Sequence, residues 1–289
     1  MPEFLQVWPA HGPGSACGKS LGDVPTSTVG YELRTNPSIQ AAVDEQTFVQ
    51  FILAGQPEPP LYFARMKRDN RRGPELLRTL PSPALLHVAD LAALENRDDI
   101  AVLDTRPREA FFNGHLAGSL LTELDYQFCS IAGSYVQEGT PIYLVADQTR
   151  LDDAIRALIR VGLDHVAGYI TPETLAGYGR QRASLARITT IDMAQLEEQR
   201  AFGRAHVLDV RSAAEFEAGH VPGALHLPHT RIAVNAGTLP IDNPLLVYCN
   251  SGARAAAAVS MLQHLGRSAV YVNDNFANYR RADQLAARA

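Results

Sequence analysis

The chain has 289 residues, with 26 Lys and Arg residues against 31 Asp and Glu residues, so its formal net charge of -5 gives no electrostatic reason to expect a nucleic-acid partner. Hydrophobic residues make up 46% and charged residues 20%, which is ordinary for globular proteins and excludes a disordered chain, a collagen or a coiled coil. No apolar run reaches the roughly 18 residues of a membrane span, the first residues lack the pattern of a secretory signal, and the three cysteines are too few for a disulfide scaffold. We therefore expect a cytoplasmic protein of about two domains, without a membrane or nucleic-acid partner.

Residues 1–80 contain little that could form an independent core. We expect one amphipathic helix at about Ser38 to Leu53, after a Gly-rich loop (Gly12 to Gly22) and before a proline cluster at 57–60. A basic run from Arg65 to Arg72 follows. This is thin material for a core, so we expect the segment to be part of a larger unit.

An internal repeat organises the rest of the chain. Residues 102–120 and 207–225 align without gaps at a constant offset of 105, with identical residues at nine of the nineteen positions. Random pairing would give about one identity. The identical pairs are Val102/Val207, Leu103/Leu208, Asp104/Asp209, Arg106/Arg211, Phe111/Phe216, Gly114/Gly219, His115/His220, Gly118/Gly223 and Leu120/Leu225. We place the two copies at 84–180 and 187–289, with Gly177 to Arg187 as the linker.

Both copies alternate strand patterns with helix patterns. In the first copy the expected elements, in chain order, are a strand, a helix, a strand, a helix and a strand at Ile100–Leu103, Arg108–Phe112, Pro141–Val145, Leu151–Val161 and His165–Ala167. In the second copy the same order is expected at Ala205–Val210, Ala213–Ala218, Pro244–Tyr248, Ala255–Leu265 and Ser268–Val272. This order predicts an α/β fold with two tandem domains, each a parallel sheet flanked by helices.

The loop from Cys249 to Arg254 is the candidate for chemistry. It follows a buried strand and precedes a helix, which places Cys249 at the carboxyl edge of a parallel sheet, where open α/β folds form their sites. Backbone N–H groups and the helix dipole point at the sulfur, and Arg254 adds a full positive charge, so both favour the nucleophilic thiolate. Gly252 allows the close turn that a nest of N–H groups needs.

The alternative for a free cysteine is a structural role in packing. We favour this role for Cys129, which lies in a helix-like stretch with Phe128 and Ile131. Cys17 lies in the Gly-rich loop, where His11 is the only neighbouring base. The sequence thus singles out one of three thiols as reactive.

Four motifs lie in order along the second copy. They are Asp209-Val-Arg211, Glu215-Phe216, Gly219-His220-Val-Pro-Gly223-Ala and the loop Cys249-Asn250-Ser251-Gly252-Ala253-Arg254. Together they resemble a rhodanese domain, a sulfurtransferase module, over about 100 residues. The resemblance implies that Cys249 accepts a sulfane sulfur as a persulfide and passes it to a thiophilic acceptor. The other implied roles are anion stabilisation and substrate binding, assigned to Arg254 and to Asn250, Ser251, Gly252 and Ala253, respectively.

The resemblance also makes predictions about residues other than the cysteine. It implies that Asp209, Arg211 and His220 form a buried, structural hydrogen-bonding set. Related phosphatase loops have one more residue between Cys and Arg, so the loop in this chain suits a single sulfur atom. The chain departs from the family pattern near its end, where residues 274–279 lack the usual Gly-Gly and Trp.

The first copy lacks the nucleophile. Alignment of 144–146 with 246–248 places Asp147 opposite Cys249, and the loop is two residues shorter. A carboxylate cannot accept a sulfur atom, and we expect Arg150 to be an exposed charge near a helix N-terminus. We interpret this copy as an inactive rhodanese-like domain that serves as a scaffold and shapes access to Cys249.

The N-terminal stretch carries a second resemblance. Residues 7–19, 30–32 and 62–67 resemble the C-terminal end of a metallo-β-lactamase-fold domain and, more narrowly, that of persulfide dioxygenase-like proteins that continue into two rhodanese domains. The resemblance places His11 at the metal site, but the principal ligand motif, His-x-His-x-Asp-His, is absent from the sequence. We therefore expect no metal and no cofactor, and interpret residues 1–80 as a remnant that is either a truncation or a retained tail.

Two functions from different classes follow. The first is a sulfurtransferase that moves sulfane sulfur from thiosulfate, a polysulfide or a persulfide through Cys249 to a thiol or cyanide-like acceptor. The second is a noncatalytic binding or sulfur-delivery module that acts with a separate persulfide dioxygenase-like partner. Metal-dependent persulfide oxidation by a truncated fusion is a third option. Candidates for the rim of the donor pocket are Asn250, Ser251, His226, His229 and Arg231.

Overall fold

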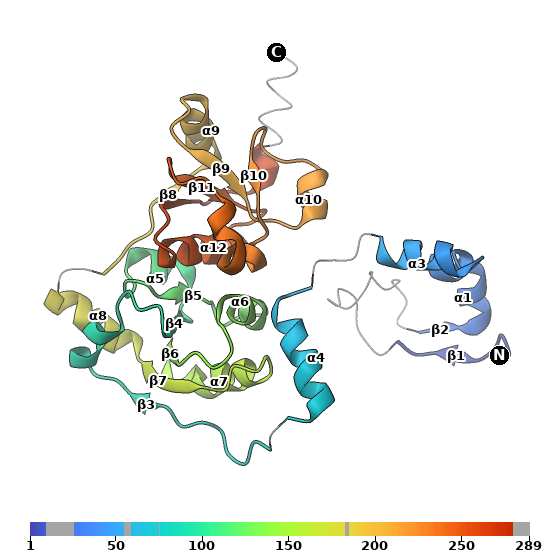
Figure 1. Ribbon diagram of the computed structural model, residues 1–289, viewed down its shortest axis with the longest axis horizontal. Coiled ribbons are helices and arrows are strands. Elements are labelled where there is room, and N and C mark those ends of the chain that lie inside the picture. The colour runs from blue at the N-terminus through green and yellow to red at the C-terminus, as the bar shows by residue number, and fades with distance from the viewer. Residues whose placement is uncertain (10–25, 55–58, 75, 183–184, 280–289) are drawn as a thin grey trace. The chain divides into compact units, whose positions relative to one another are not determined.

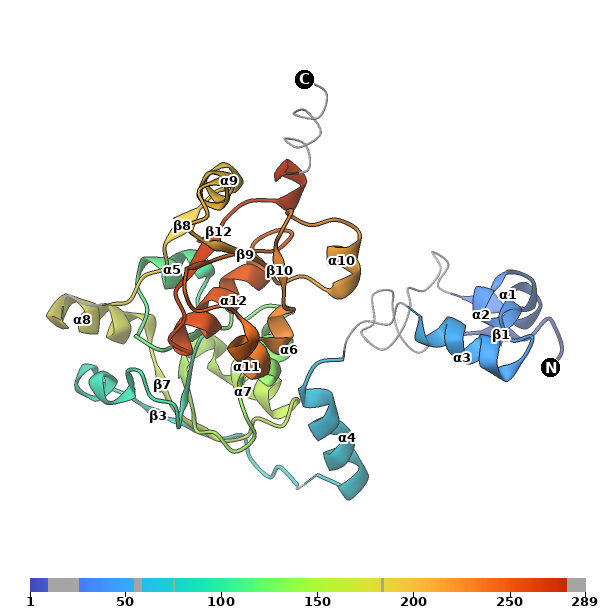
Figure 2. The same ribbon diagram turned by 45° about the horizontal axis from the view of Figure 1, so that its top comes forward.

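The computed structural model describes residues 1–9, 26–54, 59–74, 76–182 and 185–279 (Figures 1 and 2). It divides into two compact units, Met1–Pro59 and Pro60–Ala289. His11, Cys17 and the Gly-rich loop lie outside the described residues. No helix among the described residues has both the length and the apolar character that a membrane crossing requires.

The smaller unit is made of short elements. The single helix predicted at Ser38–Leu53 is wrong, because the chain forms two helices, α2 (Pro37–Gln40) and α3 (Glu45–Leu53). The Asp44 side chain accepts the N–H of Thr47 and starts the second helix anew. The other elements are β1 (Gln6–Val7), β2 (Ser27–Thr28) and α1 (Val29–Thr35), with β1 and β2 antiparallel.

The basic run of the sequence is the helix α4 (Tyr62–Arg72), and it belongs to the larger unit. Arg65 Nη2 donates to the carbonyl of Val161 at 2.5 Å. The Tyr62 ring packs on Gly133, where a Cβ would come within 2.5 Å of the ring. The helix therefore packs on the first copy, although the predicted boundary at residue 80 assigns it to the N-terminal segment.

Each copy contains a five-stranded parallel sheet, and the two sheets share one strand order. The order is β3-β7-β6-β4-β5 in the first copy and β8-β12-β11-β9-β10 in the second. The first copy comprises β3 (Ala84–Leu85), η1 (Val88–Leu94), β4 (Ala101–Asp104), α5 (Arg108–Asn113), β5 (Leu120–Leu121), α6 (Phe128–Tyr135), β6 (Ile142–Val145), η2 (Gln148–Arg150), α7 (Leu151–Ile159), β7 (Val166–Ile170) and α8 (Pro172–Arg182). The second comprises β8 (Thr190–Ile191), α9 (Met193–Ala201), β9 (His206–Asp209), α10 (Ala213–Glu217), β10 (Leu225–His226), η3 (His229–Arg231), α11 (Ile232–Asn235), η4 (Ala236–Thr238), β11 (Leu245–Tyr248), α12 (Ala253–His264) and β12 (Ala269–Val272). The predicted α/β fold with two parallel sheets flanked by helices is confirmed.

The predicted linker at Gly177–Arg187 is wrong over its first part, which belongs to α8. Tyr178 on this helix is only 2% exposed, because it packs into the core of the first copy. Ala186 then pairs with His115 in an antiparallel bridge. The polar composition that suggested a linker reflects the outer face of a packed helix.

The two copies pack against each other through α12. All eight residues from Ala255 to Leu262 are buried, and Figure 1 shows the helix next to β5. β5 is an edge strand, and its Leu121 N–H donates to Ser260 Oγ at 3.0 Å. The small alanine side chains allow this close approach, so the helix that follows the candidate loop also forms the junction of the copies.

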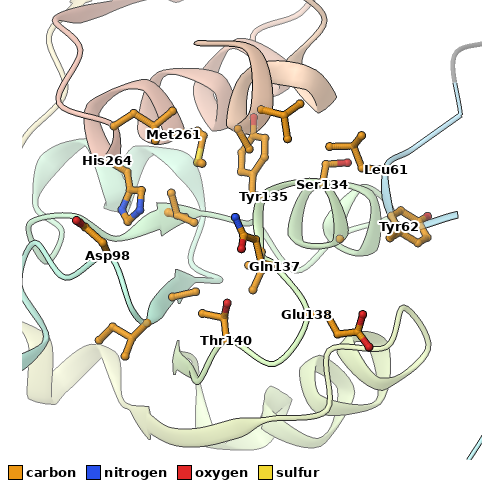
Figure 3. A pocket seen from close by; sticks show the side chains of 18 of the residues that line it. Leu61, Tyr62, Asp98, Ser134, Tyr135, Gln137, Glu138, Thr140, Met261 and His264 are labelled. Atoms are coloured by element: carbon orange, nitrogen blue, oxygen red, sulfur yellow. The ribbon is translucent and has the colours of Figure 1, made fainter. Parts of the chain in front are cut away.

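A separate cavity of about 630 Å³ lies beside this junction (Figure 3). Its wall includes Tyr62 of α4, Tyr135 of α6, and Met261 and His264 of α12. None of the residues 249–254 lines it. This cavity is therefore distinct from the loop predicted to carry chemistry.

Candidate active site

The structure places Cys249 directly after β11, at the carboxyl end of a central strand. The Gly252 N–H donates to Cys249 Sγ at 3.1 Å, so the loop folds back over the sulfur. The Phe276 N–H donates to the Asn250 carbonyl at 3.1 Å and so links the loop to the segment that follows β12. Asn250 and Ser251 are exposed, whereas Cys249 is only 1% exposed. The thiol is thus covered in this conformation.

Glycine is required at position 252 for two reasons. Its φ of +93° lies in the left-handed region, which side-chain-bearing residues avoid. A Cβ would also lie 2.2 Å from Tyr271 Oη. The turn that brings its N–H to the sulfur therefore depends on the absence of a side chain.

Arg254 is held by Glu215 of α10 in a two-point ion pair, with Nη1–Oε2 and Nη2–Oε1 distances of 2.6 and 2.7 Å. Hydrogen bonding to Arg254 lowers the pKa of Glu215 to about 2. The pKa of Arg254 is raised, first by its hydrogen bond to Glu215 and also by the nearby Cys249 sulfur. Arg254 is therefore close to the cysteine, as predicted, but its charge is balanced by a carboxylate.

Sequence reasoning assigned no role in the site to Glu215, although a signal for its position was present. Ser212 and Glu215 have the spacing of a capping box, and the structure shows that box at the start of α10. The box fixes the carboxylate where Arg254 reaches it. A residue that caps one helix thereby orients an arginine on another.

Two of the predicted rim histidines have different surroundings. Burial, together with the charge of Arg254, lowers the pKa of His229 to about 4. His226 is part of the fold, because Nε2 bonds to the Arg211 carbonyl at 2.9 Å and its ring stacks on Phe216 at 4.4 Å. Of this pair, the structure brings only His229 into the electrostatic surroundings of Arg254.

The predicted buried hydrogen-bonding set holds for two of its three members. Asp209 and Arg211 are buried and share a two-point ion pair, and Tyr248 Oη donates to Asp209 Oδ2 at 2.6 Å. His220 is exposed and bonds instead to the Phe216 carbonyl at 2.8 Å. The prediction that His220 is buried is wrong, because α10 leaves this face of the second copy open to solvent.

Comparison with known proteins decides the family of the second copy. Residues 192–281 match the family model of the Rhodanese-like domain. The second copy is a rhodanese-like domain. Among the described residues, no group of three or more His, Cys, Asp or Glu side chains is arranged to hold a metal ion.

Individual relatives match parts of the chain. A protein named Sulfurtransferase from Allochromatium vinosum is 37% identical over 60 residues, which are 21% of this chain and 56% of that protein. The HTH-type transcriptional regulator Rv0324 of Mycobacterium tuberculosis is 31% identical over 94 residues, 32% of this chain and 42% of that protein. A solved metallo-beta-lactamase from Staphylococcus aureus is 34% identical with a TM-score of 0.49, covering 60% of this chain and 46% of its own. The chain spans about half the length of the curated relatives that it matches.

The corresponding loop of the first copy is built differently from that of the rhodanese-like domain. Asp147 caps the short helix η2, accepting the N–H of Thr149 at 2.8 Å. Arg150 is about half exposed and pairs with Asp153, as expected of a surface charge at a helix start. Cys129 donates to the Ala157 carbonyl within α6–α7 packing, and burial raises its pKa.

The first copy nevertheless borders the loop of the rhodanese-like domain. The rings of Phe112 and Tyr271 lie 4.7 Å apart across the junction. Ala253 lines a narrow crevice together with Leu121, Glu123 and Asp125 of the first copy. Residues of both copies therefore surround the candidate site.

Proposed function

We propose that the chain is a sulfurtransferase in which Cys249 carries sulfane sulfur as a persulfide. The observation that carries this proposal is the Gly252 N–H aimed at Cys249 Sγ, with the Arg254 guanidinium near the sulfur. Backbone N–H groups and a nearby guanidinium stabilise anionic sulfur, both as the thiolate and as the persulfide. The match to a rhodanese-like domain and a relative named Sulfurtransferase support the proposal.

The proposed reaction has two balanced steps. The Cys249 thiolate attacks the outer sulfur of a donor such as thiosulfate, a new S–S bond forms, and the donor's own S–S bond breaks as sulfite leaves with the electron pair. A thiol or cyanide-like acceptor then takes the outer sulfur from the persulfide, and the thiolate is restored. Asn250, Ser251, Gly252 and Ala253 surround the transferred sulfur in this proposal, and no cofactor takes part.

The test is mass spectrometry of the whole chain after incubation with thiosulfate, a polysulfide and glutathione persulfide in turn. We expect a gain of about 32 Da that maps to Cys249 and disappears on addition of a thiol acceptor. Cys249→Ser should show neither the gain nor turnover, whereas Cys129→Ser, as the matched control, should show both. Turnover that persists in Cys249→Ser would end the proposal.

A second function is favoured by the exposed apolar side chains of the smaller unit. Among the residues of this unit that the structure describes, Gly30 is the only buried one. Phe4 and Trp8 are 79% and 71% exposed. Such exposed apolar groups are typical of surfaces that bind another protein, so the chain would deliver sulfur to a separate persulfide dioxygenase-like partner. Co-purification with such a partner, lost on Trp8→Ser, would support this function, and rapid turnover of thiosulfate by the chain alone would make it unnecessary.

A further inference from the structure

Arg108 brings a cation from the first copy to the candidate loop of the second. It is the first residue of α5, and its Nη1 lies 3.1 Å from the position that a Cβ on Gly252 would occupy. Tyr271 Oη lies 2.2 Å from the same position. The Gly252 N–H that bonds Cys249 Sγ thus belongs to a residue in direct reach of the first copy.

The guanidinium of Arg108 lies beside the Tyr271 hydroxyl, and one of its nitrogens has no acceptor among the described residues. The backbone N–H donates to Glu123 Oε1 at 2.5 Å, and Nε lies 3.5 Å from Glu109 Oε1. Nη1 is buried and, within the part of the chain that the structure describes, has no hydrogen-bond acceptor. A buried guanidinium N–H without an acceptor is unfavourable, so this nitrogen is prepared for an anion that enters the site.

Arg108 differs from Arg254 because, among the described residues, no carboxylate holds its guanidinium in a two-point ion pair. Arg254 is already paired with Glu215 through two hydrogen bonds. Glu109 is 75% exposed, so solvent weakens its attraction for Arg108. Burial lowers the pKa of Arg108, but the neighbouring Tyr271 hydroxyl and the Glu123 carboxylate outweigh it and the net shift is upward, so the guanidinium stays charged.

The repeat shows that this cation is specific to the first copy. At the constant offset of 105, Arg108 corresponds to Ala213, which begins α10 as Arg108 begins α5. The copy without a cysteine in its own loop thus supplies a charged side chain where the other copy has a methyl group.

We propose that Arg108 binds the anionic group of the sulfur donor beside Cys249, so that the inactive copy completes the site and selects small anionic donors such as thiosulfate. The proposal rests on the proposed function for the identity of the donor. The guanidinium would bind the sulfonate oxygens while the outer sulfur lies toward Cys249 Sγ. Because sulfite then leaves with the electron pair, the same cation also stabilises the leaving group.

The test measures thiosulfate binding without turnover. In the full chain carrying Cys249→Ser, calorimetric titration with thiosulfate should give an affinity that falls at least about tenfold when Arg108→Gln is added. Arg150→Gln, which removes an exposed cation from the same copy, should leave the affinity unchanged. In the chain with Cys249 intact, Arg108→Gln should raise the KM for thiosulfate more than that for methanethiosulfonate, which has one negative charge fewer.

The outcomes separate this inference from the proposed function. Equal thiosulfate affinity with and without Arg108, or no measurable binding to the Cys249→Ser chain, overturns the role of Arg108 even if Cys249 forms a persulfide. Binding that depends on Arg108 in a chain that never gains sulfur would overturn the proposed function and leave the anion site standing. If Arg108→Gln lowers the melting temperature to the working range, Arg108→Lys replaces it; we expect about threefold weaker binding because the guanidinium fork is lost, and unchanged binding overturns the inference.

Discussion

The two copies have the same framework and different loops. In both, an aspartate at the end of a central strand holds an arginine two residues later, with Nη2–Oδ2 distances of 2.6 Å for Arg106–Asp104 and for Arg211–Asp209. Each arginine also donates to a glycine carbonyl eight residues on. These identical Asp, Arg and Gly residues of the repeat therefore hold the end of the strand and the following turn together in both copies, whether or not the copy has a cysteine in its loop.

The two copies differ in the loops that follow β6 and β11. In the second copy a left-handed glycine turns its N–H onto a cysteine sulfur. In the first copy the Asp147 side chain instead accepts the N–H of Thr149, two residues later in the same turn. A sulfur-transfer site is therefore expected to need the loop conformation as well as the nucleophile. This can be tested by placing a cysteine in the loop of the first copy, which lacks that conformation.

The largest effect is expected when the cysteine is moved to the loop of the first copy, where it should not support sulfur transfer. In a Cys249→Ser chain, adding Asp147→Cys should not restore transfer, and activity should stay at least about 10³-fold below the unmodified chain. The reason is that residue 147 caps a 3-10 turn in a shorter loop, where no left-handed glycine directs an N–H at it. Steady-state thiosulfate turnover measures this, and recovery of even a tenth of the activity would show that the loop conformation is unimportant.

The next effect concerns the loop glycine itself. Gly252→Ala should lower the free energy of unfolding by about 3 kcal/mol, because backbone strain adds to a clash with Tyr271. Gly266→Ala, with a φ of +71° and open space around it, should cost about 1 kcal/mol from strain alone. Gly237→Ala, which has open space and no such φ, should cost less still. Urea denaturation of the three variants checks the series, and equal losses at 252 and 266 would contradict the clash.

The ion pair found only in the second copy should confer acid sensitivity. The pKa of Glu215 falls from its ordinary 4.5 to about 2 on folding. The ionised carboxylate therefore contributes fully to the free energy of unfolding above pH 4.5, and this contribution is lost as the pH falls toward 2. Since the side chain is 35% exposed, we expect only about 1 kcal/mol after allowance for solvent screening. Unfolding measured at pH 7 and pH 3 should show this loss for the unmodified chain and for Glu217→Gln, but not for Glu215→Gln.

The smallest effect tests the junction of the copies. Ser260→Ala removes the hydroxyl that accepts the Leu121 N–H on edge strand β5, and should cost about 1 kcal/mol of unfolding free energy. Hydrogen exchange should become faster at Leu121. Unchanged exchange there would mean that α12 does not protect the edge of the first sheet.

Much of the fold could be predicted from local pattern. The strands at β9, β11 and β12 and the helix α12 follow from short apolar runs and a helix-forming stretch that ends at a glycine. The helix at Ser38–Leu53 could not, because its apolar spacing continues across the turn that Asp44 interrupts. His220 shows the same limit, since His115, at the same repeat position, is buried and His220 is not.

The sequence alone determined the repeat, the α/β class and the position of Cys249, because these depend on periodicity and residue type along the chain. Only the tertiary structure decided that Glu215 balances Arg254, that Tyr271 closes over Gly252, and that Arg108 of the other copy reaches the same loop. These contacts join residues that are 19 to 144 positions apart by their sequence numbers. Local propensity does not encode such contacts; they arise when two sheets and the helix between them pack together.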